Sequence, residues 1–219
     1  MSLLRSLVRL AVPFVGAMAL CSAVMAQNNQ PSYELTDPLP TDSPGKVEVL
    51  EFFWYGCPHC YALEPVLQPW IDKLPRDVVF KRVPAIFNEN WAASARVYYA
   101  LESMGQIARL HRPFFDAINR DNLRPTSESD LLQWLTSNGI DRPQYQAAAK
   151  SFSTESRLKR AAQLIDAARI NGVPAIVIQG RHVVNAAGSP QQMLAMVDQY
   201  IAEERKALTT ARPGAKAAR

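Results

Sequence analysis

A strand that passes into a helix through a tight turn is the feature that most restricts the fold of this chain. Residues 46–55, KVEVLEFFWY, follow a turn signal and carry apolar side chains on both alternating faces. Such a strand is typical of a sheet interior covered on each side. Gly56 permits a sharp exit, and Pro58 suits the first turn of a helix, where its missing N–H costs nothing. The pattern predicts a buried strand, a turn and a helix that begins at Cys57.

Cys57 and Cys60 stand at the start of this predicted helix, with Pro58 and His59 between them. A purely structural disulfide is a poor explanation, because a pair so close in sequence closes a very short loop and adds little stability through chain entropy. The residues favour redox chemistry instead. We therefore predict that the four residues of this CPHC segment form a catalytic motif.

Metal and haem sites are the alternatives for the same segment. A structural zinc site needs four ligands, and the histidines outside the segment, His111 and His182, lie far away in sequence. Covalent haem attachment needs a histidine directly after the second cysteine, where this chain has Tyr61. We predict no metal site and no bound cofactor, and we interpret both distant histidines as surface or helix-packing residues.

The start of the helix would make Cys57 acidic. Unpaired backbone N–H groups and the helix dipole favour a thiolate there. His59 can add a hydrogen bond or a positive charge to the same sulfur, while Cys60 is expected to be the buried partner. A stabilised thiolate favours the reduced dithiol, so the disulfide form is expected to be a strong oxidant.

Residues 1–26 are predicted to be a cleaved signal peptide. Arg5 and Arg9 precede an apolar run, and Val24 and Ala26 supply the small residues of a cleavage site. An uncleaved anchor is the alternative, but the run is shorter than the ~20 apolar residues of a spanning helix.

Export would place the mature chain in an oxidising compartment. Cys21 is expected to leave with the signal, because Leu20 precedes it where a lipid-anchor motif needs a small residue. Cys57 and Cys60 would then be the only cysteines of the mature chain.

The net charge of +4 does not indicate a nucleic-acid surface. Part of the excess lies at the two ends, including residues 209–219, TTARPGAKAAR, which lack apolar periodicity and are predicted to be a disordered tail. The charges between the ends nearly balance. We expect no nucleic acid as a partner.

Two motifs resemble the DsbA family of periplasmic thiol:disulfide oxidoreductases. Residues 50–67, LEFFWYGCPHCYALEPVL, are similar to its active-site strand and helix, and residues 172–184, GVPAIVIQGRHVV, are similar to its cis-proline loop and following hairpin. CPHC is a specific marker, whereas CxxC alone is shared by reductases and isomerases. The resemblance extends from about Tyr33 to Leu208.

This resemblance implies an α/β protein, a thioredoxin fold with an inserted α-helical domain. The two parts of the thioredoxin fold are expected at residues 27–88 and 166–208, with the helical insertion at 89–165, where the sequence shows helical patterns. Pro65 and Pro69 lie inside the first predicted helix, so we also expect a kink or break near Glu64.

The resemblance also implies a function. The enzyme is expected to act in the periplasm as a monomer and to introduce disulfide bonds into unfolded exported proteins, donating its Cys57–Cys60 disulfide through a mixed-disulfide intermediate. A quinone-coupled membrane oxidase of the DsbB type would restore the disulfide. A disulfide isomerase or reductase is one alternative, and a non-catalytic chaperone that binds peptides is another.

Pro174 has two interpretations. The residues alone fit a trans proline that starts a strand, because Pro174 lies between a helical segment and the β-rich AIVI. The resemblance implies a cis Val173–Pro174 bond beside the cysteines, with the backbone of Val173 available to bind an extended substrate by strand addition.

Glu51 is either at the solvated end of its strand or a buried acid with a raised pKa. The resemblance implies a buried acid that exchanges protons with the cysteines together with a lysine on a neighbouring strand. Residues 78–84 offer both Lys81 and Arg82. The predicted relay names Lys81, with Arg82 as the alternative partner. An arginine in that place would weaken the relay, because it holds its proton too firmly to pass it on.

Overall fold

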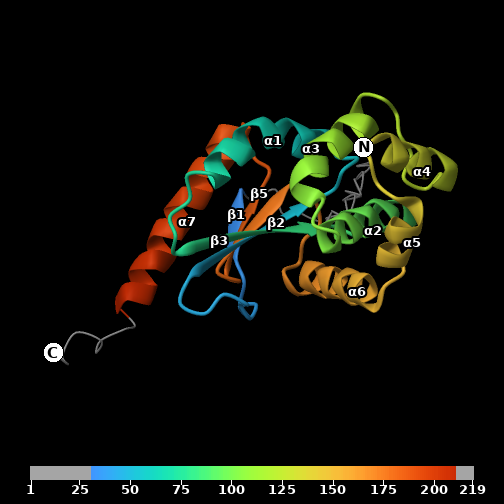
Figure 1. The fold of residues 1–219 in the computed structure, drawn as a ribbon. Helices are drawn as coiled ribbons and strands as arrows, with labels where there is room; N and C mark the ends of the chain where they lie inside the picture. The colour runs from blue at the N-terminus through green and yellow to red at the C-terminus, as the bar shows by residue number, and fades with distance from the viewer. Residues whose placement is uncertain (1–30, 211–219) are drawn as a thin grey trace, which may run out of the picture.

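A mixed β-sheet forms the centre of the computed structural model, which describes residues 31–210 (Figure 1). The strands are β1 (Ser32–Glu34), β2 (Val47–Phe53), β3 (Val78–Pro84), β4 (Ala175–Ile178) and β5 (His182–Asn185). The helices are α1 (Pro58–Ile71), α2 (Glu89–Ser103), α3 (Ile107–Asn119), α4 (Glu128–Ser137), α5 (Arg142–Ala149), α6 (Phe152–Ala167) and α7 (Pro190–Thr210).

The strand order is β1-β5-β4-β2-β3, and β2 therefore has a neighbour on each side. It pairs parallel with β3 and antiparallel with β4. Every residue of β2 is buried, as the apolar run predicted. In the parallel pairing Glu51 stands opposite Arg82, and Leu50 stands opposite Lys81. Partners in register share a face of the sheet, so this register decides which cation can meet Glu51.

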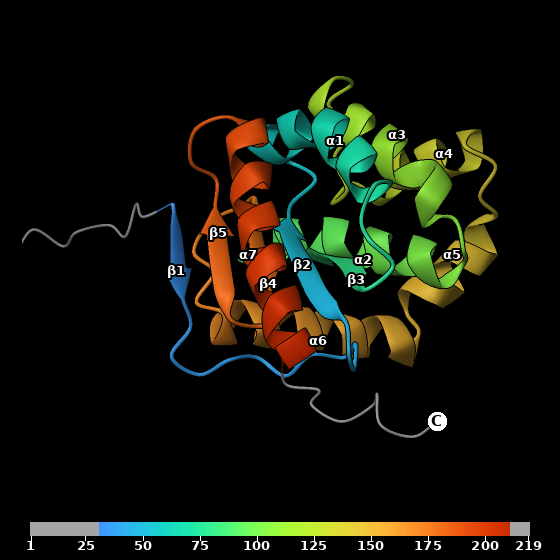
Figure 2. The same cartoon turned by 90° about the vertical axis from the view of Figure 1, so that its left-hand side faces the viewer.

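The helices divide into two groups around the sheet. Helices α1 and α7 lie side by side over one face, where Leu63 and Val197 pack with Val47 and Val49 of β2 (Figure 2). Helices α2 to α6 form the second group, and α2 contacts α3, α5 and α6 within it (Figure 1). The chain enters this group after β3 and returns to the sheet at β4, which is the inserted arrangement expected from the sequence.

Two local expectations need correction. Helix α1 continues through Pro65 and Pro69, so of the kink or break expected near Glu64 the break does not occur. Helix α7 includes Thr209 and Thr210, which were assigned to the tail. The rest of the predicted tail and the predicted signal peptide lie outside the described residues. Within residues 31–210 no helix is long and apolar enough to cross a membrane.

Candidate active site

Cys57 lies where β2 has turned into α1. It is the N-cap residue of the helix, and Pro58 occupies the first helical turn, as the sequence predicted. The backbone N–H of Cys57 donates to the Trp54 carbonyl oxygen at 3.0 Å, which closes the turn. The sulfur therefore sits at the end of the helix where free N–H groups are concentrated.

The contacts of the Cys57 sulfur favour its thiolate. The pKa of Cys57 is lowered to about 6, first by a hydrogen bond from the Cys60 thiol, against the opposing effect of burial. Backbone N–H groups of Cys60 and His59 and the charge of His59 lower this pKa further. The Cys60 N–H lies 3.4 Å from Cys57 Sγ. In the thiol form, Cys57 Sγ donates to the Val173 carbonyl oxygen, also at 3.4 Å.

Cys60 has the opposite character. Its side chain is fully buried, and burial raises its pKa well above that of a free thiol. The structure holds both cysteines as free thiols. One acidic thiol and one buried, weakly acidic thiol make a pair in which each sulfur is suited to a different step of disulfide exchange.

The loop before β4 brings Val173 and Pro174 against the cysteines. The Val173–Pro174 peptide bond is cis, as the resemblance implied. Pro174 is buried, whereas Val173 is only half-buried and lies within reach of Cys57. A hollow of about 90 Å³ next to this loop is lined by His59, Pro174 and Met193, among others. A hollow with largely apolar walls thus lies beside the cis-proline loop and His59 of the CPHC segment.

Glu51 lies beneath the site and is fully buried. Its pKa is raised to about 8, first by burial, with Arg82 lowering it and Glu64 raising it. Arg82 Nε is 3.1 Å from Glu51 Oε2, yet the two are not aligned as a hydrogen bond, and both Glu51 oxygens lack a hydrogen-bond partner among the described residues. The interpretation of Glu51 as a solvated strand end was therefore wrong.

The cation beside Glu51 is Arg82 and not Lys81, which corrects the predicted relay pair. Lys81 points to the other face of the sheet, where its Nζ lies 2.5 Å from Glu48 Oε2. The cause is the strand period, because neighbouring residues of β3 face opposite sides. An arginine does not release its proton at physiological pH, so Lys81 and Arg82 are both unsuitable as proton carriers for Glu51.

A buried polar cluster that the sequence did not reveal adjoins Glu51. Arg82 Nη2 donates to both oxygens of Glu64, at 3.3 and 3.4 Å. His111 Nε2 lies 3.3 Å from Glu64 Oε1, and its Nδ1 lies 2.7 Å from the Tyr55 hydroxyl. Burial acts to raise the pKa of Glu64, but the bonds from His111 and Arg82 leave that pKa lowered. Burial lowers the pKa of His111.

Spacing could have identified two members of this cluster. Glu64 shares a helical stripe with Cys60, Leu63 and Leu67. His111 likewise lies among the buried apolar residues of α3. A polar residue on a buried stripe needs a hydrogen-bond partner, and here Glu64 and His111 are partners of each other.

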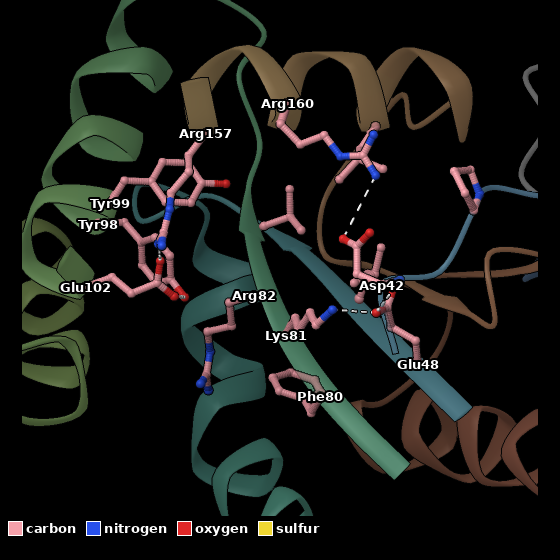
Figure 3. A pocket seen from close by; sticks show the side chains of 14 residues that line it. Asp42, Glu48, Phe80, Lys81, Arg82, Tyr98, Tyr99, Glu102, Arg157 and Arg160 are labelled. Carbon is pink, nitrogen blue, oxygen red and sulfur yellow. Dashed lines mark hydrogen bonds and ion pairs between the residues drawn. The ribbon is translucent and has the colours of Figure 1, made fainter. Parts of the chain in front are cut away.

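A second pocket, of about 480 Å³, lies beside β3 and between α2 and α6 (Figure 3). Acidic neighbours pair with three of its cations: Lys81 with Glu48, Arg157 with Glu102, and Arg160 with Asp42 at 4.0 Å. The lining does not include either cysteine. These three cations are thus paired with acidic groups of the protein itself, away from the reactive sulfur.

Arg82→Met is expected to lower the free energy of unfolding by about 3 kcal/mol, because it removes the cation that the buried side chains of Glu51 and Glu64 share. Denaturant unfolding at neutral pH measures this. The matched control is Lys81→Met, since Lys81 is more exposed and Glu48 keeps its bond from Ser43. The control should cost about 1 kcal/mol or less. Equal losses in the two variants would contradict a special role for the buried arginine.

Comparison with known proteins bears on the identity of this site. Residues 71–201 match the model of the DSBA-like thioredoxin domain, a range that begins after the two cysteines. The thiol:disulfide interchange protein DsbA of Pseudomonas aeruginosa is 38% identical over 176 residues, which cover 80% of this chain and 83% of the relative. DsbA of Bordetella pertussis is 37% identical over 201 residues, 90% of this chain and 96% of the relative. The chain belongs to the DsbA family.

Solved structures of the family agree with this assignment. The crystal structure of Pseudomonas aeruginosa DsbA superposes with a TM-score of 0.78 at 36% identity, covering 82% of this chain and 94% of that one. Reduced DsbA1 from Neisseria meningitidis gives a TM-score of 0.71 at 26% identity, covering 83% and 96%. The thioredoxin fold with a helical insertion is thereby confirmed, and this DsbA family member is a thiol:disulfide oxidoreductase.

Proposed function

We propose that this DsbA family member works as an oxidase that donates the Cys57–Cys60 disulfide to pairs of cysteines in exported proteins. The observation that carries the proposal is the contrast between the two thiols. Cys57 has a pKa of about 6 at the helix start, whereas burial raises the pKa of Cys60. A stabilised Cys57 thiolate makes the reduced form favourable and the disulfide form a ready donor.

The reaction has two exchanges. A client thiolate attacks Cys57 Sγ, the enzyme's S–S bond breaks, and Cys60 leaves as a thiolate that takes up a proton. A second client thiolate then attacks the client sulfur of the mixed disulfide and expels Cys57, a good leaving group because of its low pKa. The client gains a disulfide, and its two electrons remain on the enzyme as the dithiol.

We assign Glu51 as the group that exchanges a proton with Cys60. Its pKa of about 8 means that it is protonated at neutral pH and can supply a proton, and Glu51 is among the groups that raise the pKa of Cys60. His59 and Pro58 belong to the same catalytic motif, His59 through its effect on Cys57. The assignment replaces the predicted pair with Glu51 alone as proton carrier.

The client polypeptide is assigned to the surface around the half-buried Val173. Its backbone would pair with an extended client, and the hollow beside Pro174 would accept a client side chain. Pairing through the backbone places little demand on client sequence. The predicted signal peptide supports a periplasmic location, and return to the disulfide form requires an external oxidant, for which we propose a quinone-coupled membrane partner of the DsbB type.

The equilibrium of the Cys57–Cys60 couple with glutathione tests the direction of the reaction. We expect the dithiol to dominate even at low ratios of reduced to oxidised glutathione. Trapping the thiols in intact cells provides a second test, because a resting state that is mostly reduced would contradict an oxidase and favour an isomerase or a reductase.

Glu51→Gln is expected to remove one step of the pH profile of Cys60. The probe is the enzyme with glutathione attached to Cys57, from which Cys60 releases glutathione once it loses its proton. In the wild type this release should rise with pH through about 8 as Glu51 ionises. The variant should lack that rise and be slower by about 10²-fold at alkaline pH.

Glu48→Gln is the matched control for this experiment. Glu48 lies on the same strand, but it faces the opposite side and pairs with Lys81. Its profile should follow the wild type. A rise near pH 8 that persists in Glu51→Gln would remove Glu51 from the proton transfer.

A further inference from the structure

Three aromatic side chains form a continuous row that ends beside the active site. The rings of Phe87 and Trp91 have centroids 4.8 Å apart. Trp91 and Trp54 then stack with centroids 4.2 Å apart and planes at 7°. We call these three residues the aromatic row. They come from the β3–α2 connection, the first turn of α2 and the residue after β2.

The inner end of the row touches the backbone that leads into Cys57. A Cβ atom placed on Gly56 would lie only 2.4 Å from the indole of Trp54, so the indole rests directly on this glycine. The carbonyl of Trp54 also accepts the N–H of Cys57. Gly56 therefore lets a large aromatic ring lie next to the nucleophile, where a residue with a side chain would displace it.

The outer end of the row is open to solvent. Phe87 is 42% exposed, and Phe152 is the other large apolar side chain described as exposed, at 88%. Trp54 and Trp91 are half-buried. The hollow beside Pro174 is lined by residues of α1 and of the segments around β4 and α7, and the lining does not include the aromatic row. The row is therefore a second apolar surface near Cys57.

A client that reacts with Cys57 must bring its chain close to this row. An extended chain advances about 3.3 Å per residue, so the residues on either side of a client cysteine lie within about 7 Å of the bond that forms. The Trp54 indole covers Gly56, the residue next to Cys57, so the inner end of the row lies beside the path of such a chain. Trp91 and Phe87 continue the row outward. Apolar rings with an open edge attract aromatic and aliphatic side chains and give little advantage to small polar ones.

We propose that the aromatic row binds an aromatic or large aliphatic side chain flanking the client cysteine, and that it thereby sets a preference among clients. This inference rests on the proposed oxidation of protein thiols and adds a specificity surface to it. The backbone contact at Val173 would hold any extended client, whereas the aromatic row would distinguish clients by the residue beside the cysteine.

Two peptides and one small dithiol provide the test. Each peptide carries two cysteines, flanked by phenylalanine in one and by serine in the other, and dithiothreitol supplies thiols without side chains. Oxidised glutathione is the oxidant that restores the enzyme disulfide in each turnover. The ratio of kcat/KM for the phenylalanine peptide to that for the serine peptide should fall roughly 3- to 10-fold in Phe87→Ser and in Trp91→Leu. The change should reside mainly in KM. Phe87→Tyr, which keeps the ring, should retain the wild-type ratio.

Phe152→Ser is the matched control, because Phe152 is a more exposed aromatic residue at the start of α6. It should leave the ratio unchanged. Phe87 is exposed, so its replacement tests the proposal even if Trp91→Leu perturbs the fold. Equal losses for both peptides and dithiothreitol would show that the row only supports the active-site structure, and an unchanged ratio in Phe87→Ser would show that clients do not touch it. Either result overturns the proposal.

The same substrates separate this inference from the proposed function. If the wild type does not oxidise dithiothreitol, the oxidase assignment fails. The preference is then measured in the reverse reaction, in which the reduced enzyme reduces the disulfide forms of the two peptides. A wild-type preference for the phenylalanine peptide that depends on Phe87 supports the aromatic row in either direction, and its absence in both directions contradicts it.

Discussion

Cys57→Ser is expected to abolish disulfide transfer, leaving only the uncatalysed rate. A serine hydroxyl does not ionise at neutral pH and cannot form a disulfide, so neither exchange can take place. The loss should exceed that of any other single substitution, because Cys60 is fully buried and its raised pKa keeps it protonated. Oxidation of a peptide with two cysteines, followed by mass spectrometry, measures this result.

Cys60→Ser provides the informative comparison. It keeps the reactive thiol but removes the sulfur that would displace a bound client or glutathione, so mixed disulfides on Cys57 should accumulate. Residual turnover in Cys57→Ser above the buffer rate would contradict the assignment of Cys57 as the nucleophile. Activity in preventing aggregation that survives Cys57→Ser, together with no oxidase activity in the wild type, would favour a chaperone.

The reduced protein is expected to be more stable than the oxidised one at pH 7, by roughly 1 kcal/mol. The pKa of Cys57 is about 6 in the fold against 9.0 for an ordinary cysteine thiol, so folding favours the thiolate. Each pKa unit is worth about 1.4 kcal/mol of free energy. At pH 7 only the interval between the folded pKa of about 6 and the ambient pH contributes, which is about one unit, and solvent around this half-buried sulfur reduces the contribution somewhat. The disulfide offers little in return, because its loop is very short.

The sign of the pH dependence follows from the lowered pKa. A group whose pKa is depressed by folding adds its full stability above the unfolded pKa, about 9 here, and loses it as the pH falls through the folded value of about 6. The difference in free energy of unfolding between the two forms should therefore shrink from pH 7 toward about pH 5. Denaturant unfolding of both forms over this pH range measures the difference. Glu51 has a pKa of about 8, so it stays protonated over the range and does not obscure the effect of Cys57.

Cys57→Ser is also the control for this measurement. Without the ionising thiol, the stability of the variant should lack the pH-dependent gain that reduced wild-type protein shows between about pH 5 and pH 7. An oxidised form that is equally stable or more stable at pH 7 would rule out thiolate stabilisation as the source of the oxidising character.

The segment from β2 to α1 was predictable because its signals are local. Continuous apolar residues indicate a covered strand, and glycine followed by Cys-Pro indicates a turn and a helix start, which the structure confirms. The two prolines inside α1 do not break the helix, although their presence predicted a break. Leu63 and Leu67 pack against the sheet on both sides of Pro65 and hold the helix together there. Packing energy there outweighs the cost of the missing hydrogen bond.

The surroundings of Glu51 depend on contacts that no local pattern encodes. Lys81 and Arg82 are neighbours in sequence, and a shift of one residue in the β2–β3 register would exchange their faces. His111 arrives from the helical insertion and meets Glu64 of α1 across 47 residues of chain. A single sequence contains the donors and acceptors of this cluster but not their pairing.

The sequence by itself determined the reactive pair, the helix start that makes Cys57 acidic and, through the resemblance, the family and fold. These follow from residues close together in the chain, whose effect on one another is set by backbone geometry. Tertiary structure alone decided that Arg82 lies beside both Glu51 and Glu64, that His111 is a buried partner of Glu64, and that an aromatic row ends at Gly56. Strand register and helix packing make these contacts, because they bring together side chains that are distant in sequence and select one face of each element for the site.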